Sequence, residues 1–556
     1  MIGAQAAIAQ GFQAYQRGDL AAARSALQGV QHPHAWHLLG LIERKAGQFS
    51  LALDWLAKAE TADRRNPEIA NNQGRVALDA GQVIDAEKYF RRALSLRSDW
   101  EPALTGLGKT LTAQKRWQEA RQVWNQVLKQ KPQDVSGHYN AAMADVELGQ
   151  LDQAEAAFSS LIDAGVDDAA VWFMRGRARC EASQIDQGIA DLEMAWVKRP
   201  EAHVLKNLAN TLWMSGQTDR FHHLLSNVPE PLAVMAVDLR GQSGDLRQAL
   251  EDWAQLSETQ QNQAEALAIK SVLHRDLKEI DAAYEAGEAA LKISPNSPFV
   301  IDAAACGRLM VGDGEGALEI IKPLRLAQPN SQHWLAYETT ALRVMGDPRY
   351  DHLVQLDQHV RAYELPVPEG FETIQSFNDA FLEALEPVRG FTTHPLDQSL
   401  RLGQQTSRDL VTTPDPVIQA YIKALDQPIR AFMKDMGKAP DHPLTARNSG
   451  EYAFNGCWSV KLIGGGRHVN HIHSEGWISS AYYASVPAET RSGDSKSGWI
   501  KFAEPPFQTQ PETPPQKWIQ PEAGLLVLFP SYLWHGTEPI NGTSERVTAP
   551  FDVVPI

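Results

Sequence analysis

The sequence predicts a multidomain fold: an all-α solenoid of helical hairpins, followed by a β-sandwich or jelly-roll domain with flanking helices. Three observations support this prediction. The chain has 556 residues, which is too many for a single hydrophobic core. Small and large residues recur at one regular interval through its first two-thirds. Its last third is richer in Pro, Gly, Trp and Thr, and contains short strand-forming runs bounded by turn residues.

The repeat is defined by three series of positions that share the same constant spacing. They are Gly40, Gly74, Gly108, Ala142 and Gly176; Ala52, Ala86, Ala120, Ala154 and Gly188; and Leu56, Phe90, Trp124, Phe158 and Leu192. Small residues in the first two series let paired helices approach closely, and the large residue of the third series fills the space between hairpins. Three series in one register indicate a repeat array.

With small, small and large positions at this period, the array resembles the tetratricopeptide repeat (TPR) family, and Asn72 to Leu96 forms a nearly complete repeat. We expect the TPR-like α-solenoid to span residues 1–362, with a degenerate stretch between about 200 and 265. Stacked hairpins curve into a superhelix with a concave face. The resemblance implies a groove that binds a protein or peptide. A spacer or a dimerisation platform is the alternative.

The helical pattern ends near "YELPVPEGF", Tyr363 to Phe371, where two prolines and a glycine interrupt it. We expect residues 363–390 to be a linker with a connecting helix, and residues 391–556 to form the strand-rich domain. Four short runs predict strands: "WSVKLI", "WISSAYYASV", "GWIKFA" and "GLLVLFP". The proline-rich segment 505–518 is either a mobile lid or a plain loop. The "IGGG" motif at 463–466 predicts a flexible hairpin turn.

Composition limits the classes of partner. The net charge of −16 argues against nucleic acid, which requires clustered Lys and Arg. No apolar run reaches the length of a membrane span. The N-terminal residues lack the basic and apolar regions of a signal peptide. The three cysteines, Cys180, Cys306 and Cys457, form no CxxC pair and favour a reducing compartment. We therefore expect a cytoplasmic location, with no nucleic-acid or membrane partner.

The segment "HVNHIHSEG" predicts a metal site. His471 and His473 alternate with Ile472, so in an extended segment both imidazoles lie on the same face. Two ligands from one strand end and a third from a distant strand form an open metal site. His535 is the candidate third ligand, since it follows an apolar strand, and Arg546 comes eleven residues later.

The order of these features resembles the 2-oxoglutarate/Fe(II) oxygenase superfamily, which is built on a double-stranded β-helix. In particular, residues from about 390 to the end resemble a bacterial oxygenase family found behind TPR arrays. In the superfamily a His-x-Asp/Glu pair ends an early strand, a second His comes late, and an Arg about ten residues further binds 2-oxoglutarate. The resemblance implies Fe(II) and 2-oxoglutarate as cofactors and dioxygen as co-substrate.

This sequence departs from the superfamily pattern, because the position two residues after His471 is another histidine. Two ligand sets remain open: His471, His473 and His535, or His473, Glu475 and His535. We favour the three-histidine set, because "HIH" alternates into a strand whereas Glu475 lies beside a glycine at an expected turn. His468 is expected outside the ligand set.

The remaining site residues are implied by the resemblance. Arg546 would bind the distal carboxylate of 2-oxoglutarate through two parallel hydrogen bonds, with the Thr548 hydroxyl assisting. The superfamily often adds a tyrosine from the strand after the metal pair. Tyr482 and Tyr483 face opposite sides of that strand, and we favour Tyr483 as the inward one. The catalytic group is then His471, His473 and His535, and the implied reaction is hydroxylation of an unactivated C–H bond.

Three functions fit these features to different degrees. The first is a 2-oxoglutarate-dependent dioxygenase whose TPR array recruits a protein or peptide substrate. The second is a TPR interaction protein whose β-helix domain is non-catalytic or senses metal; the three candidate ligands and Arg546 argue against it. The third is a cupin-type enzyme, which would not need the carboxylate-binding Arg546. The sequence does not identify the substrate.

Overall fold

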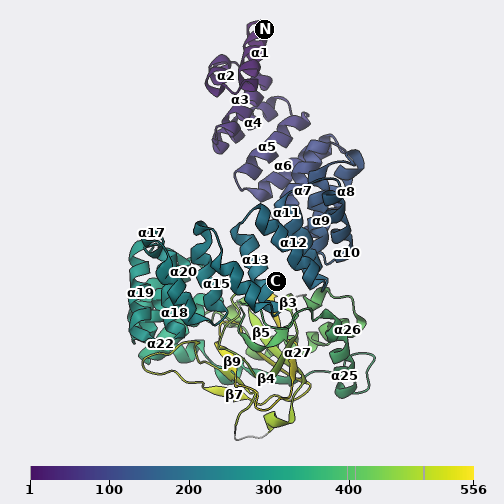
Figure 1. Cartoon of the computed structure of the whole chain (residues 1–556). Coiled ribbons are helices and arrows are strands. Elements are labelled where there is room, and N and C mark those ends of the chain that lie inside the picture. The colour runs from purple at the N-terminus through teal and green to yellow at the C-terminus, as the bar shows by residue number, and fades with distance from the viewer. Residues whose placement is uncertain (1, 397, 407–408, 492–494) are drawn as a thin grey trace. The chain divides into compact units, whose positions relative to one another are not determined.

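The computed structural model describes residues 2–396, 398–406, 409–491 and 495–556 (Figure 1). The chain divides into two compact units, Met1–Ala178 and Arg179–Ile556. Within the described ranges, no helix has both the length and the apolar character that crossing a membrane requires.

The first unit consists of antiparallel helical hairpins. Its helices are α1 (Ile2–Gln16), α2 (Leu20–Leu27), α3 (Pro33–Lys45), α4 (Phe49–Ala62), α5 (Pro67–Asp79), α6 (Val83–Leu96), α7 (Glu101–Ala113), α8 (Trp117–Gln130), α9 (Val135–Glu147) and α10 (Leu151–Asp163), with α11 (Ala169–Glu181) at the division. Pro33 and Pro67, which lie one repeat apart, occupy the first turns of α3 and α5, where the fixed φ of proline favours a helix start.

The repeat is also visible in the turns inside the hairpins. Residues that follow one another by exactly one repeat adopt positive φ: Gly47, Gly81, Lys115, Gly149 and Ser183. A second series with the same spacing comprises Gly244, Lys278, Gly312 and Gly346. These positions end the first helix of a hairpin in a left-handed conformation, which glycine adopts most readily. The two series differ in register, and the change of register falls in the stretch predicted to be degenerate.

The large residues of the repeat pack against its small ones within each hairpin. Phe90 of α6 also fills the space to the next hairpin, as predicted, since a Cβ atom added to Gly106 of α7 would lie 2.2 Å from its ring. Leu56, Phe90 and Trp124 are fully buried. A Cβ atom added to Gly74 would lie 2.8 Å from the Phe90 ring, and one added to Gly108 would lie 2.7 Å from the Trp124 ring. Any larger residue at these glycines would force the paired helices apart.

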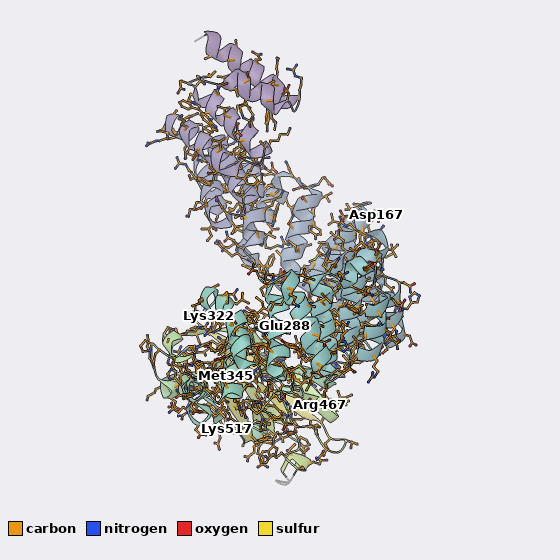
Figure 2. All side chains as sticks on the ribbon, turned by 90° about the vertical axis from the view of Figure 1, so that its left-hand side faces the viewer. Asp167, Glu288, Lys322, Met345, Arg467 and Lys517 are labelled. Carbon is orange, nitrogen blue, oxygen red and sulfur yellow. The ribbon has the colours of Figure 1, made fainter. Side chains whose placement is uncertain are left out.

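The second unit begins with further hairpins. Its helices are α12 (Ile185–Lys198), α13 (Ala202–Met214), α14 (Thr218–Ser226), η1 (Glu230–Leu232), α15 (Ala233–Gln242), α16 (Leu246–Gln255), α17 (Glu258–Gln261), α18 (Ala264–Asp276), α19 (Ile280–Ile293), α20 (Pro298–Met310), α21 (Gly314–Ala327), α22 (Gln332–Met345), α23 (Arg349–Leu353) and α24 (Leu356–His359). Short helices α14 to α17 interrupt the regular pattern. Figure 2 labels Met345 at the end of α22.

The strand-rich part contains two antiparallel sheets. Its strands are β1 (Arg361–Glu364), β2 (Leu400–Gln405), β3 (Tyr452–Cys457), β4 (Val460–His468), β5 (Ile478–Ser485), β6 (Ile500–Phe502), β7 (Lys517–Ile519), β8 (Leu525–Pro530), β9 (His535–Thr537), β10 (Arg546–Thr548) and β11 (Phe551–Pro555). The larger sheet has the order β1-β8-β5-β10-β4-β2, with β11 pairing β3 and β5; the smaller has the order β7-β6-β9. The predicted fold class is confirmed: an all-α repeat region precedes an antiparallel domain of jelly-roll type.

Helices cover one face of the larger sheet. They are α25 (Ile374–Leu385), α26 (Pro416–Ala424) and α27 (Asp426–Met436). This part of the chain also contains the short 3-10 helices η2 (Glu386–Val388), η3 (Leu410–Thr412), η4 (Thr445–Arg447) and η5 (Ala488–Arg491). Phe381, Tyr421 and Tyr482 are fully buried in the core between these helices and the sheet. Removing such apolar area from water stabilises the fold by roughly 25 cal/mol per Å².

The glycines at 464–466 lie inside strand β4, so the hairpin turn predicted there is wrong. Close approach of other backbone explains these residues. A Cβ atom on Gly464 would lie 2.1 Å from the Gly542 carbonyl oxygen, and one on Gly466 would lie 2.4 Å from the Leu402 carbonyl oxygen. Glycine admits two neighbouring backbone segments that a side chain would exclude.

The three-part division at 1–362, 363–390 and 391–556 stays a prediction. In the structure, β1 crosses its first limit, because Arg361 to Glu364 pair with Leu528 to Leu525 of β8. The sheet therefore takes its first strand from the segment directly after the solenoid, ahead of the expected connecting helix α25.

Candidate metal centre and cofactor pocket

The segment after β4 and the start of β9 bring two histidines together. His471 and His535 form an antiparallel bridge, in which the His471 N–H donates to the His535 carbonyl at 2.8 Å and the His535 N–H donates back at 3.0 Å. Their ring centroids are 4.2 Å apart. The His473 N–H donates to the Ser531 carbonyl at 3.0 Å. Backbone pairing thus fixes the main-chain position from which each imidazole side chain extends.

The three imidazoles converge on one point. The nitrogen atoms of His471, His473 and His535 that could bind a metal lie within 4.8 Å of one another. The Nε2 atoms of His471 and His473 are 3.2 Å apart. The alternation of "HIH" predicts that these two rings share a face, and the structure has that arrangement.

The other ring nitrogen of each histidine is held by an acceptor. Nδ1 of His471 lies 2.9 Å from the Val469 carbonyl, and Nδ1 of His535 lies 2.9 Å from the Leu533 carbonyl. Nδ1 of His473 lies 2.6 Å from Oδ1 of Asp552. Because a carbonyl or carboxylate oxygen only accepts, each Nδ1 carries a proton, and Nε2 is the nitrogen of each ring that is left to bind a metal.

Burial keeps the imidazoles of His471 and His535 neutral. It lowers the pKa of His471 to about 3, with a further contribution from neighbouring His473. Burial likewise lowers the pKa of His535 well below its usual value. Nε2 of His471 lies 3.2 Å from Nε2 of His473, which lets both nitrogens bind one metal ion. The three residues therefore fit a divalent metal ion with nitrogen ligands, such as iron.

Arg546 lies at the buried end of the same pocket, on β10. Its side chain is fully enclosed, with the residue only 2% exposed. Nη1 donates to the Gly498 carbonyl at 2.5 Å, and Nε has no hydrogen-bond partner. Among the described residues, none supplies a carboxylate in an ion pair with it. Burial lowers the pKa of this guanidinium, which reflects the cost of a buried charge without an opposite charge.

Tyr483 and Thr548 stand beside Arg546. The Arg546 guanidinium lies over the Tyr483 ring at 5.7 Å from its centroid, and burial raises the pKa of Tyr483 to about 12, so its hydroxyl keeps its proton. Thr548 lines the same pocket. Tyr482 lies on the opposite face of β5, where its hydroxyl donates to Oδ1 of Asn378 at 2.5 Å.

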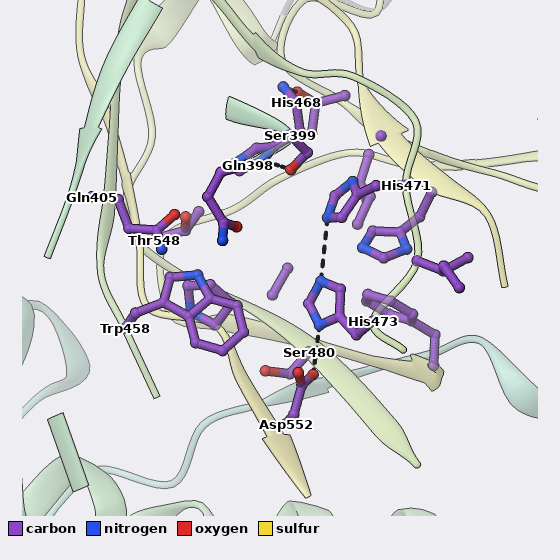
Figure 3. Close-up of a pocket in the computed structure, with 18 of the residues that line it drawn as sticks. Gln398, Ser399, Gln405, Trp458, His468, His471, His473, Ser480, Thr548 and Asp552 are labelled. Atoms are coloured by element: carbon purple, nitrogen blue, oxygen red, sulfur yellow. Dashed lines mark hydrogen bonds and ion pairs between the residues drawn. The ribbon is translucent and has the colours of Figure 1, made fainter. Parts of the chain in front are cut away.

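A single cavity of about 360 Å³ joins the histidines to Arg546 (Figure 3). Figure 3 shows Trp458, Gln398 and Gln405 across the cavity from His471 and His473. The lining residues Gln398, Ser474 and Glu475 are exposed, so they mark the mouth. The volume suits a small dicarboxylate together with part of a second molecule.

Glu475 and His468 lie outside the group of convergent nitrogens. Glu475 is exposed at the mouth, and its backbone carbonyl accepts a hydrogen bond from Asn455 at 3.1 Å. Nδ1 of His468 pairs with the Ser399 hydroxyl at 2.9 Å, and its ring centroid is 5.7 Å from that of His471.

Sequence reasoning missed Asp552. This carboxylate is 7% exposed and also accepts a hydrogen bond from the Ser479 hydroxyl at 2.7 Å. Ser479 in turn pairs with Ser531 at 2.8 Å. The available signal was an aspartate within the apolar run "APFDVV", since a carboxylate is rarely buried without partners.

Comparison with known families agrees with this geometry. Residues 456–552 match the family described as "Putative 2OG-Fe(II) oxygenase", and the match includes the three histidines, Arg546 and Asp552. Residues 77–145, 139–217 and 234–298 match tetratricopeptide repeat families. The chain carries tetratricopeptide repeats and a C-terminal domain of the putative 2OG-Fe(II) oxygenase family.

Curated relatives match over limited stretches. Protein O-mannosyl-transferase Tmtc3 of Drosophila melanogaster is 30% identical over 110 residues, which cover 19% of this chain and 12% of that protein. The CTR9 homologue of Arabidopsis thaliana is 25% identical over 202 residues, which cover 35% of this chain and 18% of that protein. This chain thus spans less than a fifth of either relative.

Solved structures match this chain with low TM-scores. Pseudomonas aeruginosa PilF has a TM-score of 0.33 and 17% identity, covering 36% of this chain and 94% of PilF. A tetratricopeptide repeat protein of Parabacteroides merdae has a TM-score of 0.33 and 15% identity, covering 55% and 98%. YrrB, a TPR protein with an unusual peptide-binding site, has a TM-score of 0.30 and 15% identity, covering 33% and 93%.

Proposed function

We propose that this protein is an Fe(II)- and 2-oxoglutarate-dependent oxygenase of the hydroxylase type, acting on a protein or peptide that its TPR array recruits. The observation that supports this most strongly is the convergence of three imidazole nitrogens in the cavity of a buried arginine that lacks a carboxylate partner among the described residues. One cavity contains both.

In this proposal His471, His473 and His535 hold the iron. Bound iron and 2-oxoglutarate supply the oxidising chemistry, with dioxygen as co-substrate. The protein fixes three nitrogen ligands on one side and leaves the cavity side open for the other participants. Glu475 is not a ligand in this proposal, because its exposed position at the mouth separates it from the convergent nitrogens.

Arg546 binds the distal carboxylate of 2-oxoglutarate in this proposal. Its Nε has no partner, and an arginine fork can meet a carboxylate with two parallel hydrogen bonds. Thr548 and the protonated hydroxyl of Tyr483 are the helpers. Binding would supply the opposite charge that the buried guanidinium lacks, so this ligand offsets a cost already present in the folded protein.

The substrate reaches the site through the mouth formed by Gln398, Ser474 and Glu475. TPR arrays are surfaces for protein–protein interaction, and repeats precede the oxygenase domain along the chain. A protein or peptide recruited by the array is therefore the proposed substrate class.

The test uses the full chain in two steps. Fe(II) and 2-oxoglutarate are first bound without oxygen, and succinate is then measured after air is admitted. The proposal expects binding of both and release of succinate. Binding of metal without any succinate would favour the alternative, a TPR scaffold with a metal-sensing domain. Binding of neither would overturn both.

A further inference from the structure

The residues next to the metal ligands point toward the end of the repeat region. Ile472 lies between His471 and His473, and Trp534 precedes His535. Because neighbouring side chains of an extended segment face opposite sides, Trp534 turns away from the cavity that His535 lines, whereas Ile472 lies at the edge of that cavity. Both pack into a hydrophobic cluster whose other members come mainly from helices α19 to α22, among them Leu309 and Tyr337.

Helix α22 makes a directed contact with Trp534. The indole Nε1–H donates to the Thr340 hydroxyl at 2.9 Å, and that hydroxyl donates to the Ala336 carbonyl at 2.8 Å. Trp534 is 7% exposed and Thr340 is 4% exposed, so water does not compete. The Trp534 ring also lies 6.0 Å from the Tyr337 ring. The residue adjoining His535 is therefore fixed in orientation.

Arg343, one turn further along α22, binds the segment between β6 and β7. Its guanidinium donates to the Ala503 and Pro514 carbonyls, the latter at 2.6 Å. The Ala503 N–H donates to the Trp534 carbonyl at 2.8 Å. Segment 505–518 is thus packed against the helices, and its Phe507 side chain joins the same cluster. Both the side chain and the backbone of Trp534 are tied, directly or through Ala503, to one helix.

We infer that Thr340, together with Tyr337 and Arg343, acts as a positioning residue for the metal centre. This inference rests on the proposed function, since it assumes that His471, His473 and His535 bind metal. Helix α22 fixes the position of Trp534, and Trp534 in turn fixes the backbone position of the neighbouring His535. Because His535 and His471 form a backbone bridge, the position of His471 depends on that of His535. The last helical hairpin before the strands is a structural part of the metal site.

The physical basis is the strict geometry of a metal site. A ligand displaced by a fraction of an ångström loses affinity, and partners that orient ligands typically change metal affinity roughly 10- to 100-fold when removed. Thr340 bonds Trp534, the neighbour of His535, and does not bond a ligand directly. We therefore expect the low end of this range.

The test compares three variants of the full chain by Co(II) titration under argon. Thr340→Val removes the hydroxyl but keeps the shape, and Thr340→Ser restores the hydroxyl. Thr339→Val is the matched control: Thr339 is also 4% exposed, and its hydroxyl also donates to the Ala336 carbonyl at 2.8 Å. Of the two threonines, Thr340 is the one that bonds Trp534.

We expect Thr340→Val to weaken Co(II) binding roughly tenfold, as the loss of one buried hydrogen bond suggests. Thr339→Val and Thr340→Ser should stay within about twofold of wild type. Equal effects of the two valine substitutions would overturn the inference while leaving the proposed metal site intact. Failure of wild type to bind Co(II) would instead overturn the proposed function, and the inference with it.

Discussion

Nδ1 of His473 lies 2.6 Å from Oδ1 of Asp552, although 79 residues separate them in the chain. The carboxylate holds the proton on Nδ1, so the Nε2 lone pair of His473 faces Nε2 of His471 at 3.2 Å. Asp552 thereby sets the tautomer and the direction of a proposed metal ligand, as outer carboxylates do in many metal sites.

Removing this carboxylate should weaken metal binding without displacing a ligand. We predict that Asp552→Ala lowers Co(II) affinity roughly 10- to 100-fold. Asp552→Asn keeps an acceptor oxygen and should lose less. Titration of both variants by Co(II) absorption checks the order. An Asp552→Ala protein with wild-type affinity would show that the contact does not orient His473.

We expect Arg546 to destabilise the unliganded protein and to be required for tight binding of 2-oxoglutarate. Replacing it with methionine removes a buried charge that lacks an opposite charge, so Arg546→Met should raise the free energy of unfolding of the unliganded protein by about 1 kcal/mol or more. The same variant should bind 2-oxoglutarate at least about 100-fold more weakly, because a charged hydrogen-bond partner is lost. Urea unfolding with and without 2-oxoglutarate measures both effects.

In that experiment 2-oxoglutarate should stabilise wild type and have no effect on Arg546→Met. Arg546→Lys is the matched control, since it keeps the charge but not the two parallel hydrogen bonds, and it should retain partial binding. Equal stabilisation of wild type and Arg546→Met by 2-oxoglutarate would remove Arg546 from the cofactor site.

The two ligand sets left open by the sequence can be separated directly. His471→Ala should weaken metal binding by more than about 100-fold, since removing a ligand costs more affinity than removing a residue that orients a ligand. Glu475→Ala should stay within about twofold, as for other exposed substitutions. Metal content after anaerobic dialysis against Fe(II) measures both. The reverse order of effects would identify Glu475 as the third ligand.

Buried histidines outside the metal site should make the protein sensitive to acid. Burial, followed by the charge of His442, lowers the pKa of His359 to about 4. The folded protein then binds this proton less readily than the unfolded chain does. Its contribution to stability is complete above about pH 6.5, the usual histidine value, and is lost as the pH falls toward 4.

Between pH 7 and pH 5 this one group should reduce the free energy of unfolding by about 2 kcal/mol. His359→Asn should reduce the change in the free energy of unfolding between these pH values by that amount, as measured by urea unfolding. His223→Asn alters an exposed ring and should leave the dependence as in wild type. An unchanged slope in His359→Asn would show that His359 is not the titrating group.

The sequence was sufficient where local patterns determine structure. The regular spacing of the repeat correctly predicted that Phe90 fills the space to the next hairpin, where it meets Gly106, because neighbouring hairpins contact each other at fixed intervals. The alternation of "HIH" correctly placed His471 and His473 on one face. Both signals lie within a short stretch of chain.

Other features depend on segments distant in sequence and were not predictable. The glycines of β4 are explained by the approach of Gly542 and Leu402 backbone. The importance of Asp552 depends on β11 lying beside β5. The attachment of Trp534 to Thr340 spans 194 residues. None of these contacts produces a periodic pattern, so only the folded chain reveals them.

The proposed function requires that three histidines bind iron and that Arg546 binds 2-oxoglutarate in the same cavity. The most direct measurement is the anaerobic binding of Fe(II) and 2-oxoglutarate to the full chain, in wild type, His535→Ala and Arg546→Met. We predict one iron and one 2-oxoglutarate per wild-type chain. We also predict loss of iron in His535→Ala and loss of 2-oxoglutarate with retained iron in Arg546→Met. Wild type that binds neither, or Arg546→Met that binds 2-oxoglutarate normally, would contradict the proposed function.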